Sequence, residues 1–346
     1  MTLPLSLLDL ASVPQGGTLS QTFRDSIALA RAAEAAGYAR VWYAEHHNIA
    51  SVASSATAVL MAQVAAHTSK IRIGAGGVML PNHSPLVIAE QFGTLETLHP
   101  GRIDLGLGRA PGGDAAVIRA LRRDPRASDR FAGDVEELLS LLAAPDPARP
   151  LPVRAIPGEG TEVPVWILGS SLFGAELAAK LGLPFAFASH FAPAALMQAA
   201  EIYRTQFRPS AHLDQPYFMM SCNVIAAETE AEAQLQATTL LQTFTGLLTN
   251  RLERTPPPRA DFEVPPAIRH HLDAMLQCTA IGTAEQVAAT LSEYRRVLRP
   301  DELMLSMPFH DPAARITSAR LTVEARDLIT ADGSSADGPS AGRATA

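Results

Sequence analysis

The stretch Val41-Trp42-Tyr43-Ala44-Glu45-His46-His47-Asn48 runs from an apolar strand into a carboxylate and two adjacent histidines. Two later segments are built in the same way, Ile71-Arg72-Ile73-Gly74-Ala75-Gly76-Gly77 and Arg102-Ile103-Asp104-Leu105-Gly106-Leu107-Gly108-Arg109. In each, a short apolar run stops at glycine or at side chains capable of chemistry, and a helical pattern follows. This arrangement is typical of α/β barrels, whose active sites form at the carboxyl ends of the strands.

Eight such strands can be traced along the 346 residues, each separated from the next by at least one helical segment. Regular alternation predicts a parallel sheet, and eight units predict closure into a (β/α)8 TIM barrel. A doubly wound open sheet is the alternative, but no Gly-x-Gly-x-x-Gly motif stands between the first strand and the first helix. Asp104 lies inside a strand, so we expect it to be paired within the barrel. The expected strands are residues 3–10, 41–44, 71–75, 103–107, 165–168, 184–188, 217–226 and 302–307.

Residues 1–330 are expected to form one barrel domain with two insertions, at about 145–164 and 250–280. The first contains prolines and glycines too closely spaced for a regular barrel element, and the second is rich in proline. Residues 331–346 are rich in glycine, serine and alanine and are expected to form a disordered tail.

The composition excludes several classes of protein. A net charge of −7 argues against a nucleic-acid partner, and no apolar run approaches the roughly 20 residues of a membrane helix. The N-terminal residues lack the basic start of a signal peptide. Only two cysteines occur, Cys222 and Cys278, which favours a reduced cytoplasmic setting over a secreted disulfide framework.

Two strand ends carry glycines and hydroxyls suited to a cofactor. Gly169-Ser170-Ser171 lies between a strand and a helix, where hydroxyls and free N–H groups suit a phosphate. Arg109, at a neighbouring strand end, can add a charge-assisted contact. The simpler interpretation is that Ser171 caps its helix. Gly76-Gly77 allows close approach by a flat ligand ring, or forms an ordinary turn.

The histidines at the strand ends make a metal site an alternative interpretation. Adjacent residues of an extended chain point to opposite faces, so only one of His46 and His47 is expected to face the barrel mouth. His46, His190 and His310 can supply the three ligands of a catalytic zinc ion. Barrels that bind metals more often use His-x-His pairs, and we therefore expect no metal site. We interpret His83 as a loop histidine.

In order and spacing, these segments resemble the bacterial luciferase-like flavin monooxygenases. The similarity covers residues 3–209 approximately and returns at Ile281-Gly282-Thr283-Ala284-Glu285-Gln286-Val287. The segments that carry it are Glu45-His46-His47, Gly76-Gly77-Val78-Met79-Leu80-Pro81-Asn82-His83-Ser84-Pro85, Ala89-Glu90-Gln91, His99-Pro100-Gly101-Arg102, Gly106-Leu107-Gly108-Arg109 and Gly169-Ser170-Ser171.

The resemblance implies roles for particular residues. His46 matches the active-site histidine of the family, and we assign Glu45 to hold its orientation. Gly76-Gly77 matches a non-proline cis peptide beneath the flavin ring. Arg109 and Ser171 match the site of the FMN phosphate, with Gly169 and Ser170 beside it. Luciferase carries a reactive cysteine just before the arginine, whereas this chain has Gly108, so light emission is not implied.

On this resemblance we expect a cytoplasmic monooxygenase that uses reduced FMN and O2 to oxygenate a small organic substrate. No NAD(P)H-binding motif is evident, so a separate NAD(P)H:flavin reductase is expected to supply the reduced flavin. Luciferase relatives commonly pair through early helices, and the alanine-rich segment 54–66 predicts a homodimer.

Three alternatives stay open. The first is hydride transfer by an oxidoreductase that uses a deazaflavin or FMN, as in some relatives. The second is a metal-dependent barrel hydrolase, and the third is a non-catalytic flavin-binding protein. The two insertions are expected to line the pocket, but they contain no motif that identifies a substrate.

Overall fold

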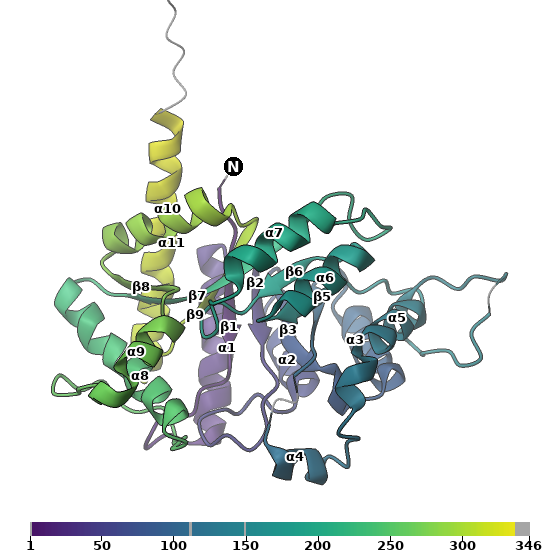
Figure 1. The fold of residues 1–346 in the computed structure, drawn as a ribbon, viewed down its shortest axis with the longest axis horizontal. Coiled ribbons are helices and arrows are strands. Elements are labelled where there is room, and N and C mark those ends of the chain that lie inside the picture. Colours follow the sequence, from purple (N-terminus) through teal and green to yellow (C-terminus); the bar gives the residue numbers. More distant parts are fainter. Residues whose placement is uncertain (1, 111–112, 149, 336–346) are drawn as a thin grey trace, which may run out of the picture.

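In the computed structural model, which describes residues 2–110, 113–148 and 150–335, parallel strands close into a central barrel (Figure 1). The hydrogen-bonded order is β1-β2-β3-β4-β5-β6-β7-β9, and β9 pairs with β1 to complete the ring. The predicted (β/α)8 TIM barrel is therefore confirmed. The barrel strands are β1 (Leu5–Asp9), β2 (Arg40–Tyr43), β3 (Arg72–Met79), β4 (Ile103–Gly108), β5 (Val165–Gly169), β6 (Phe185–Phe187), β7 (Phe218–Ala226) and β9 (Glu302–Ser306).

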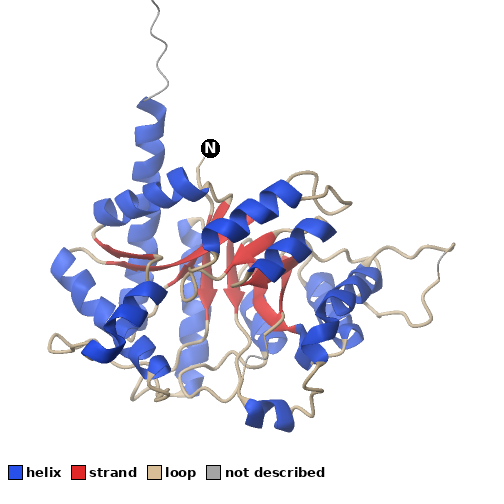
Figure 2. Ribbon diagram, viewed as in Figure 1, coloured by secondary structure: helices blue, strands red, loops and turns tan. Residues whose placement is uncertain are grey.

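Helices pack around the outside of these strands, as Figure 2 shows. None of the described helices is long and apolar enough to cross a membrane. The α-helices are α1 (Leu19–Ala36), α2 (Thr57–Ala65), α3 (Pro85–Leu98), α4 (Ala115–Ala120), α5 (Phe131–Leu142), α6 (Leu172–Leu181), α7 (Leu196–Gln206), α8 (Glu230–Leu248), α9 (Pro266–Met275), α10 (Ala284–Leu298) and α11 (Pro312–Ser335). Two 3-10 helices, η1 (Leu80–Asn82) and η2 (Ala127–Arg130), lie between them.

The structure differs from the sequence expectation in the second insertion and in the tail. Residues 250–280 contain helix α9 and the start of an additional strand, β8 (Thr279–Gly282), which pairs in parallel with β7. The sequence Thr279-Ala280-Ile281-Gly282 has only one large apolar residue, so it lacks the apolar run that marks the other strands. Helix α11 continues through Ser335, five residues into the expected tail, and its last turns project from the barrel (Figure 1). Residues 336–346 of that tail lie outside the described part of the chain.

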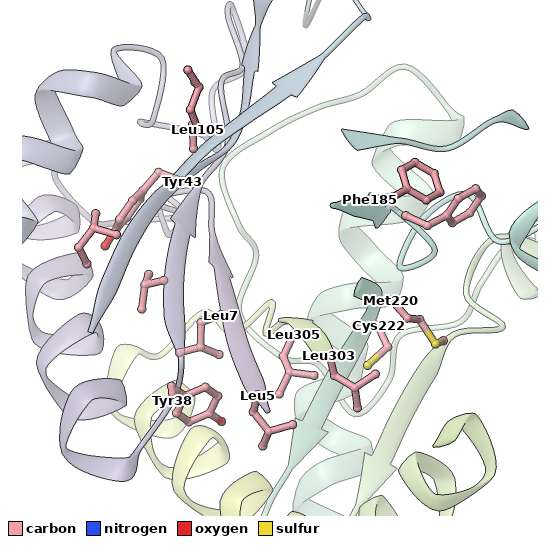
Figure 3. Close-up of a cluster of buried hydrophobic side chains, with 14 of the residues drawn as sticks. Leu5, Leu7, Tyr38, Tyr43, Leu105, Phe185, Met220, Cys222, Leu303 and Leu305 are labelled. Atoms are coloured by element: carbon pink, nitrogen blue, oxygen red, sulfur yellow. The ribbon is translucent and has the colours of Figure 1, made fainter. Parts of the chain in front are cut away.

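Side chains alternate between two environments along the barrel strands, as the two-residue period of a strand requires. Leu5 and Leu7 of β1 belong to the large core between the strands and the helices, where they lie near Leu303 and Leu305 of β9 (Figure 3). Leu8 belongs instead to a second, smaller cluster inside the barrel.

The amino end of the barrel interior is closed by a buried ion-pair network centred on Arg40. Its guanidinium donates to Asp104 Oδ2 at 2.8 Å and to the two oxygens of Glu302 at 2.8 and 3.0 Å. Arg72 donates to Asp104 Oδ1 at 2.6 Å, and the Tyr217 hydroxyl donates to Glu302 Oε2 at 2.9 Å. The expected pairing of Asp104 is confirmed. Burial alone lowers the pKa of Arg40, but the two carboxylates outweigh it and raise that pKa above its ordinary value.

An aromatic layer lies directly on this network. The rings of Trp42 and Trp166 meet edge to face with centroids 5.1 Å apart, and the Arg40 guanidinium lies 4.8 Å from the Trp166 ring centroid. Met219 and Met304 pack in the same inner cluster. These side chains therefore fill the amino end of the barrel interior, and its open end lies toward the carboxyl ends of the strands.

We expect Arg40→Met to lower the free energy of unfolding by about 3–5 kcal/mol, because it removes the cation that pairs with two buried carboxylates. The matched control is Arg296→Met, since Arg296 forms an exposed ion pair with Glu293 within α10 and such pairs contribute little to stability. Urea denaturation of the three proteins measures the difference. Equal losses in the two variants would show that the network does not stabilise the barrel.

Candidate active site

The carboxyl ends of the strands surround a cavity of about 750 Å³, a volume within the range of small-molecule and cofactor sites. Glu45 lies behind the cavity wall and is only 2% exposed. The other sequence-predicted site residues all line the cavity: His46, Gly76, Gly77, Arg109, Gly169, Ser170 and Ser171. The closed barrel thus brings together residues from four separate strand ends.

Gly76 and Gly77 interrupt the pairing of β3 with β4. The strand register shifts between Ala75 and Val78, and the Gly76–Gly77 peptide bond is cis, as the family resemblance implies. A Cβ atom on Gly76 would lie 2.9 Å from the Trp42 Cβ, and one on Gly77 would lie 2.7 Å from the Gly106 carbonyl oxygen. The close approach of neighbouring strands therefore requires glycine at both positions, and the interpretation as an ordinary turn is wrong.

Ser170 and Ser171 stand at the amino end of α6 with exposed side chains. Ser171 occupies the N-cap position, yet its hydroxyl makes no capping hydrogen bond. Ser171 therefore begins the helix without capping it through its hydroxyl, and the first N–H groups of α6 keep their capacity to bind an anion. Arg109 is exposed at the same edge, and its Cζ lies 4.3 Å from the ring centroid of Phe173 in the first turn of α6.

Glu45 is the centre of a hydrogen-bond cluster that joins the end of β2 to the end of β3. Its carboxylate accepts from His47 Nε2 at 2.9 Å, His83 Nε2 at 2.9 Å and the Met79 backbone N–H at 3.0 Å. The Asn82 side-chain amide donates to it at 3.2 Å. His83 is therefore part of the site support and more than a loop histidine. The orientation of His46 by Glu45 stays a prediction.

The environment of Glu45 favours its ionised form. Burial by itself raises the pKa of a carboxyl group, but the hydrogen bonds from His83, His47 and the Met79 N–H outweigh it and lower the pKa of Glu45 below 4.5. The cluster therefore holds a buried negative charge beside the cavity wall at neutral pH.

The three histidines of the zinc alternative do not come together. His46 and His190 line the large cavity, whereas His310 lines a separate small pocket and donates from Nε2 to the Gln15 carbonyl at 3.1 Å. Within residues 2–110, 113–148 and 150–335, no group of three or more His, Cys, Asp or Glu side chains is arranged to hold a metal ion. The structure does not support the hydrolase that this ligand set would require.

One wall of the cavity was missed by sequence reasoning. Helix α8 contributes Leu240, Thr243, Phe244 and Leu247 to the lining, and Leu252 follows them. The four helical positions follow the i, i+3, i+4, i+7 spacing of a single helix face. This spacing could have identified an apolar face on the helix, but it does not predict that the face lines the cavity.

The chain is similar to known proteins over nearly its whole length. The family described as luciferase-like monooxygenase matches residues 4–299. The protein YvbT of Bacillus subtilis is 49% identical over 322 residues, which are 92% of this chain and 96% of YvbT. A luciferase-like monooxygenase of Escherichia coli is 46% identical over 331 residues, 95% of this chain and 98% of that protein. The crystal structure of apo-MsnO8 is 35% identical, covers 94% of this chain and 99% of its own, and has a TM-score of 0.87.

We expect Glu45→Gln to destabilise the protein by about 1–3 kcal/mol at neutral pH, because an amide cannot accept hydrogen bonds at all the sites that the carboxylate fills. The pKa of Glu45 is lowered on folding, so its stabilising effect is present above pH 4.5 and is lost as the pH falls through the folded-state pKa. Thermal melts of both proteins from pH 7 to pH 3.5 should show the difference in Tm shrinking below about pH 4.5. A difference in Tm that is constant across this range would contradict the assignment.

Proposed function

Because the chain belongs to the luciferase-like monooxygenase family, we propose that this enzyme uses reduced FMN and O2 to oxygenate a small organic substrate. One observation carries the proposal: a single cavity joins His46, the cis Gly76–Gly77 peptide and the anion-accepting edge formed by Arg109 and Ser171. The resemblance to the family assigns these three parts to the flavin site.

Solved structures with the same fold support a flavin as the cofactor. The oxygenating constituent of 3,6-diketocamphane monooxygenase from Pseudomonas putida, a type II Baeyer-Villiger monooxygenase, was solved in complex with FMN and has a TM-score of 0.72 at 16% identity. An F420-dependent secondary alcohol dehydrogenase has a TM-score of 0.69 at 15% identity. Because the second protein is a dehydrogenase with the same fold, hydride transfer remains the alternative reaction for this chain.

The residues of the cavity fit FMN. In the proposal, Arg109 and the N–H groups at the start of α6 bind the phosphate, with Ser170 and Ser171 as additional donors. Gly76 and Gly77 supply a wall without side chains against which a flat ring can lie. Bound FMN, once reduced, supplies the electrons that activate oxygen.

His46 would act as a base or hydrogen-bond donor beside the flavin ring. The apolar face of α8 would exclude water from the reacting groups. Glu45 would support this arrangement indirectly, because it ties the chain segment that carries His46 to the segment that follows the Gly76–Gly77 peptide.

The proposal includes the expected partners. A separate NAD(P)H:flavin reductase would supply reduced FMN, and the enzyme would act as a homodimer in the cytoplasm. The unpaired thiols of Cys222 and Cys278 are consistent with a reducing compartment. Val59 of α2, which is 72% exposed, is available for a contact between early helices of two subunits.

Phosphate recognition predicts that FMN binds more tightly than riboflavin. Loss of a charge-assisted hydrogen bond costs about 1.5–3 kcal/mol, so riboflavin should bind about ten- to a hundredfold more weakly. The Arg109→Met variant should lose most of this preference, and Arg119→Met, which changes an exposed arginine of α4, should keep it. Fluorescence titration measures all six affinities. Equal binding of the two flavins by the wild-type protein would refute the phosphate site.

The reaction itself is tested by supplying the purified protein with FMN, a flavin reductase, NADH and isotope-labelled oxygen in the presence of a metabolite extract. A monooxygenase should place label in an organic product that mass spectrometry identifies. Conversion of a metabolite without label would favour the hydride-transfer alternative.

With that product as the readout, His46→Ala should lower turnover by about a hundredfold, the usual effect of losing a positioned acid or base, while FMN affinity stays nearly unchanged. His47→Ala is the matched control: it should reduce the melting temperature, because His47 donates to Glu45, and should affect turnover less. Wild-type turnover in His46→Ala would remove this histidine from the mechanism.

A further inference from the structure

The order of the strands divides the cavity into two halves. The proposed FMN contacts come from the ends of β3, β4 and β5, which are neighbours in the barrel. The ends of β7, β9 and β1 form the opposite side of the ring. Strands β2 and β6 lie between the two sides, four positions apart in the closed order, and they lead to His46 and His190 respectively. The two histidines therefore mark the boundary between the halves.

The second half of the cavity is lined mainly by apolar side chains. Leu8 of β1 and Met304 of β9 line this half, together with Leu240, Phe244 and Leu247 on one face of α8. The polar side chains on this side are mostly hydroxyls, such as those of Thr243 and Ser306. A surface of this kind favours an apolar ligand that keeps few polar groups.

The second half contains no unpaired charge among the residues that the structure describes. No Asp or Glu side chain lines the cavity, and Arg109 lies in the FMN half. Arg315 reaches the cavity, but it donates to Asp9 Oδ1 at 2.8 Å, and Asp9 is fully buried. A charged ligand group would therefore lose its hydration without gaining an opposite charge, which is strongly unfavourable.

His190 supplies the polar side chain at the boundary. It lines the cavity and is half-buried, so its imidazole is placed to exchange a hydrogen bond with a bound ligand. Its ring meets Phe191 edge to face with centroids 4.9 Å apart, which limits its rotation. Burial and the nearby His46 lower the pKa of His190 to about 4, so the imidazole is neutral at physiological pH.

We propose that the half of the cavity formed by β7, β9, β1 and α8 binds the substrate, and that this substrate is an uncharged, largely apolar molecule with one hydrogen-bonding group directed at the imidazole of His190. This inference rests on the proposed function, because the other half is taken to hold FMN. It makes His190 a residue that determines specificity, beside the flavin and opposite His46.

Four naphthalene probes that differ in a single substituent test the proposal: naphthalene, 2-naphthol, 2-naphthoate and 2-naphthylmethylammonium. Equilibrium dialysis with the purified protein measures their affinities with and without saturating FMN. We expect 2-naphthol to bind at least about tenfold more tightly than either ion, because both ions would be desolvated without a partner. Tighter or equal binding of an ion, or binding of none of the probes, would overturn the proposal.

Three variants isolate the contribution of His190. His190→Phe should weaken 2-naphthol about three- to tenfold, the value of one neutral hydrogen bond, and leave naphthalene nearly unchanged. His190→Gln, which keeps a hydrogen-bonding amide at this position, should restore much of the preference. His310→Phe changes a histidine outside the cavity and should have no effect. Equal losses for 2-naphthol and naphthalene in His190→Phe would refute the hydrogen bond.

The same titrations distinguish this inference from the proposed function. If the protein does not bind FMN but shows the 2-naphthol preference and its dependence on His190, the proposed function fails and the apolar site stands. If FMN binds and displaces 2-naphthol, the division of the cavity into two halves is wrong while the flavin assignment stands.

Discussion

The ion-pair network around Arg40 is the constraint on which the rest of the barrel depends. Asp104 and Glu302 are buried carboxylates from β4 and β9, on opposite sides of Arg40 of β2, and the Arg40 guanidinium pairs with both, while Arg72 also pairs with Asp104. Each partner would be costly to bury alone, so the strands that carry them must meet in one register at the amino end of the barrel. The Trp42 and Trp166 rings then cover this network. The large cavity lies at the opposite end, where the strands finish.

At that end, a second buried charge connects the pieces of the site. Glu45 receives hydrogen bonds from His47, next to His46, and from the Met79 N–H, two residues after Gly77. The two segments expected to contact the flavin are therefore tied to one carboxylate. The lowered pKa of Glu45 keeps this carboxylate charged at neutral pH. His83 adds a further hydrogen bond from the loop beyond β3. The cost of burying Glu45 is offset by donors that also hold the cavity wall in place.

The cavity itself is unequal in chemistry. On the side of β3, β4 and β5 it presents Arg109, the serines at the start of α6 and the glycine pair, whereas on the side of β7, β9, β1 and α8 it presents mostly apolar groups. This division follows from closure of the barrel, because closure puts strands that are distant in the chain on opposite sides of one opening. His46 and His190 end up between the two sides for the same reason. A reaction between a flavin and an apolar substrate would take place along that boundary.

The sequence by itself determined the eight barrel strands and the residues at their ends, because the alternation of apolar strands with helices is a local pattern that closure preserves. The resemblance to luciferase-like proteins added the cis Gly76–Gly77 peptide. Only the tertiary structure decided that His83 meets Glu45, that α8 lines the cavity, and that His310 lies away from His46. Strand β8 also escaped prediction, since its four residues include only one large apolar side chain. Hydrogen bonds and cavity walls of this kind join residues far apart in sequence, and their geometry is set by how the barrel closes, which no local pattern records.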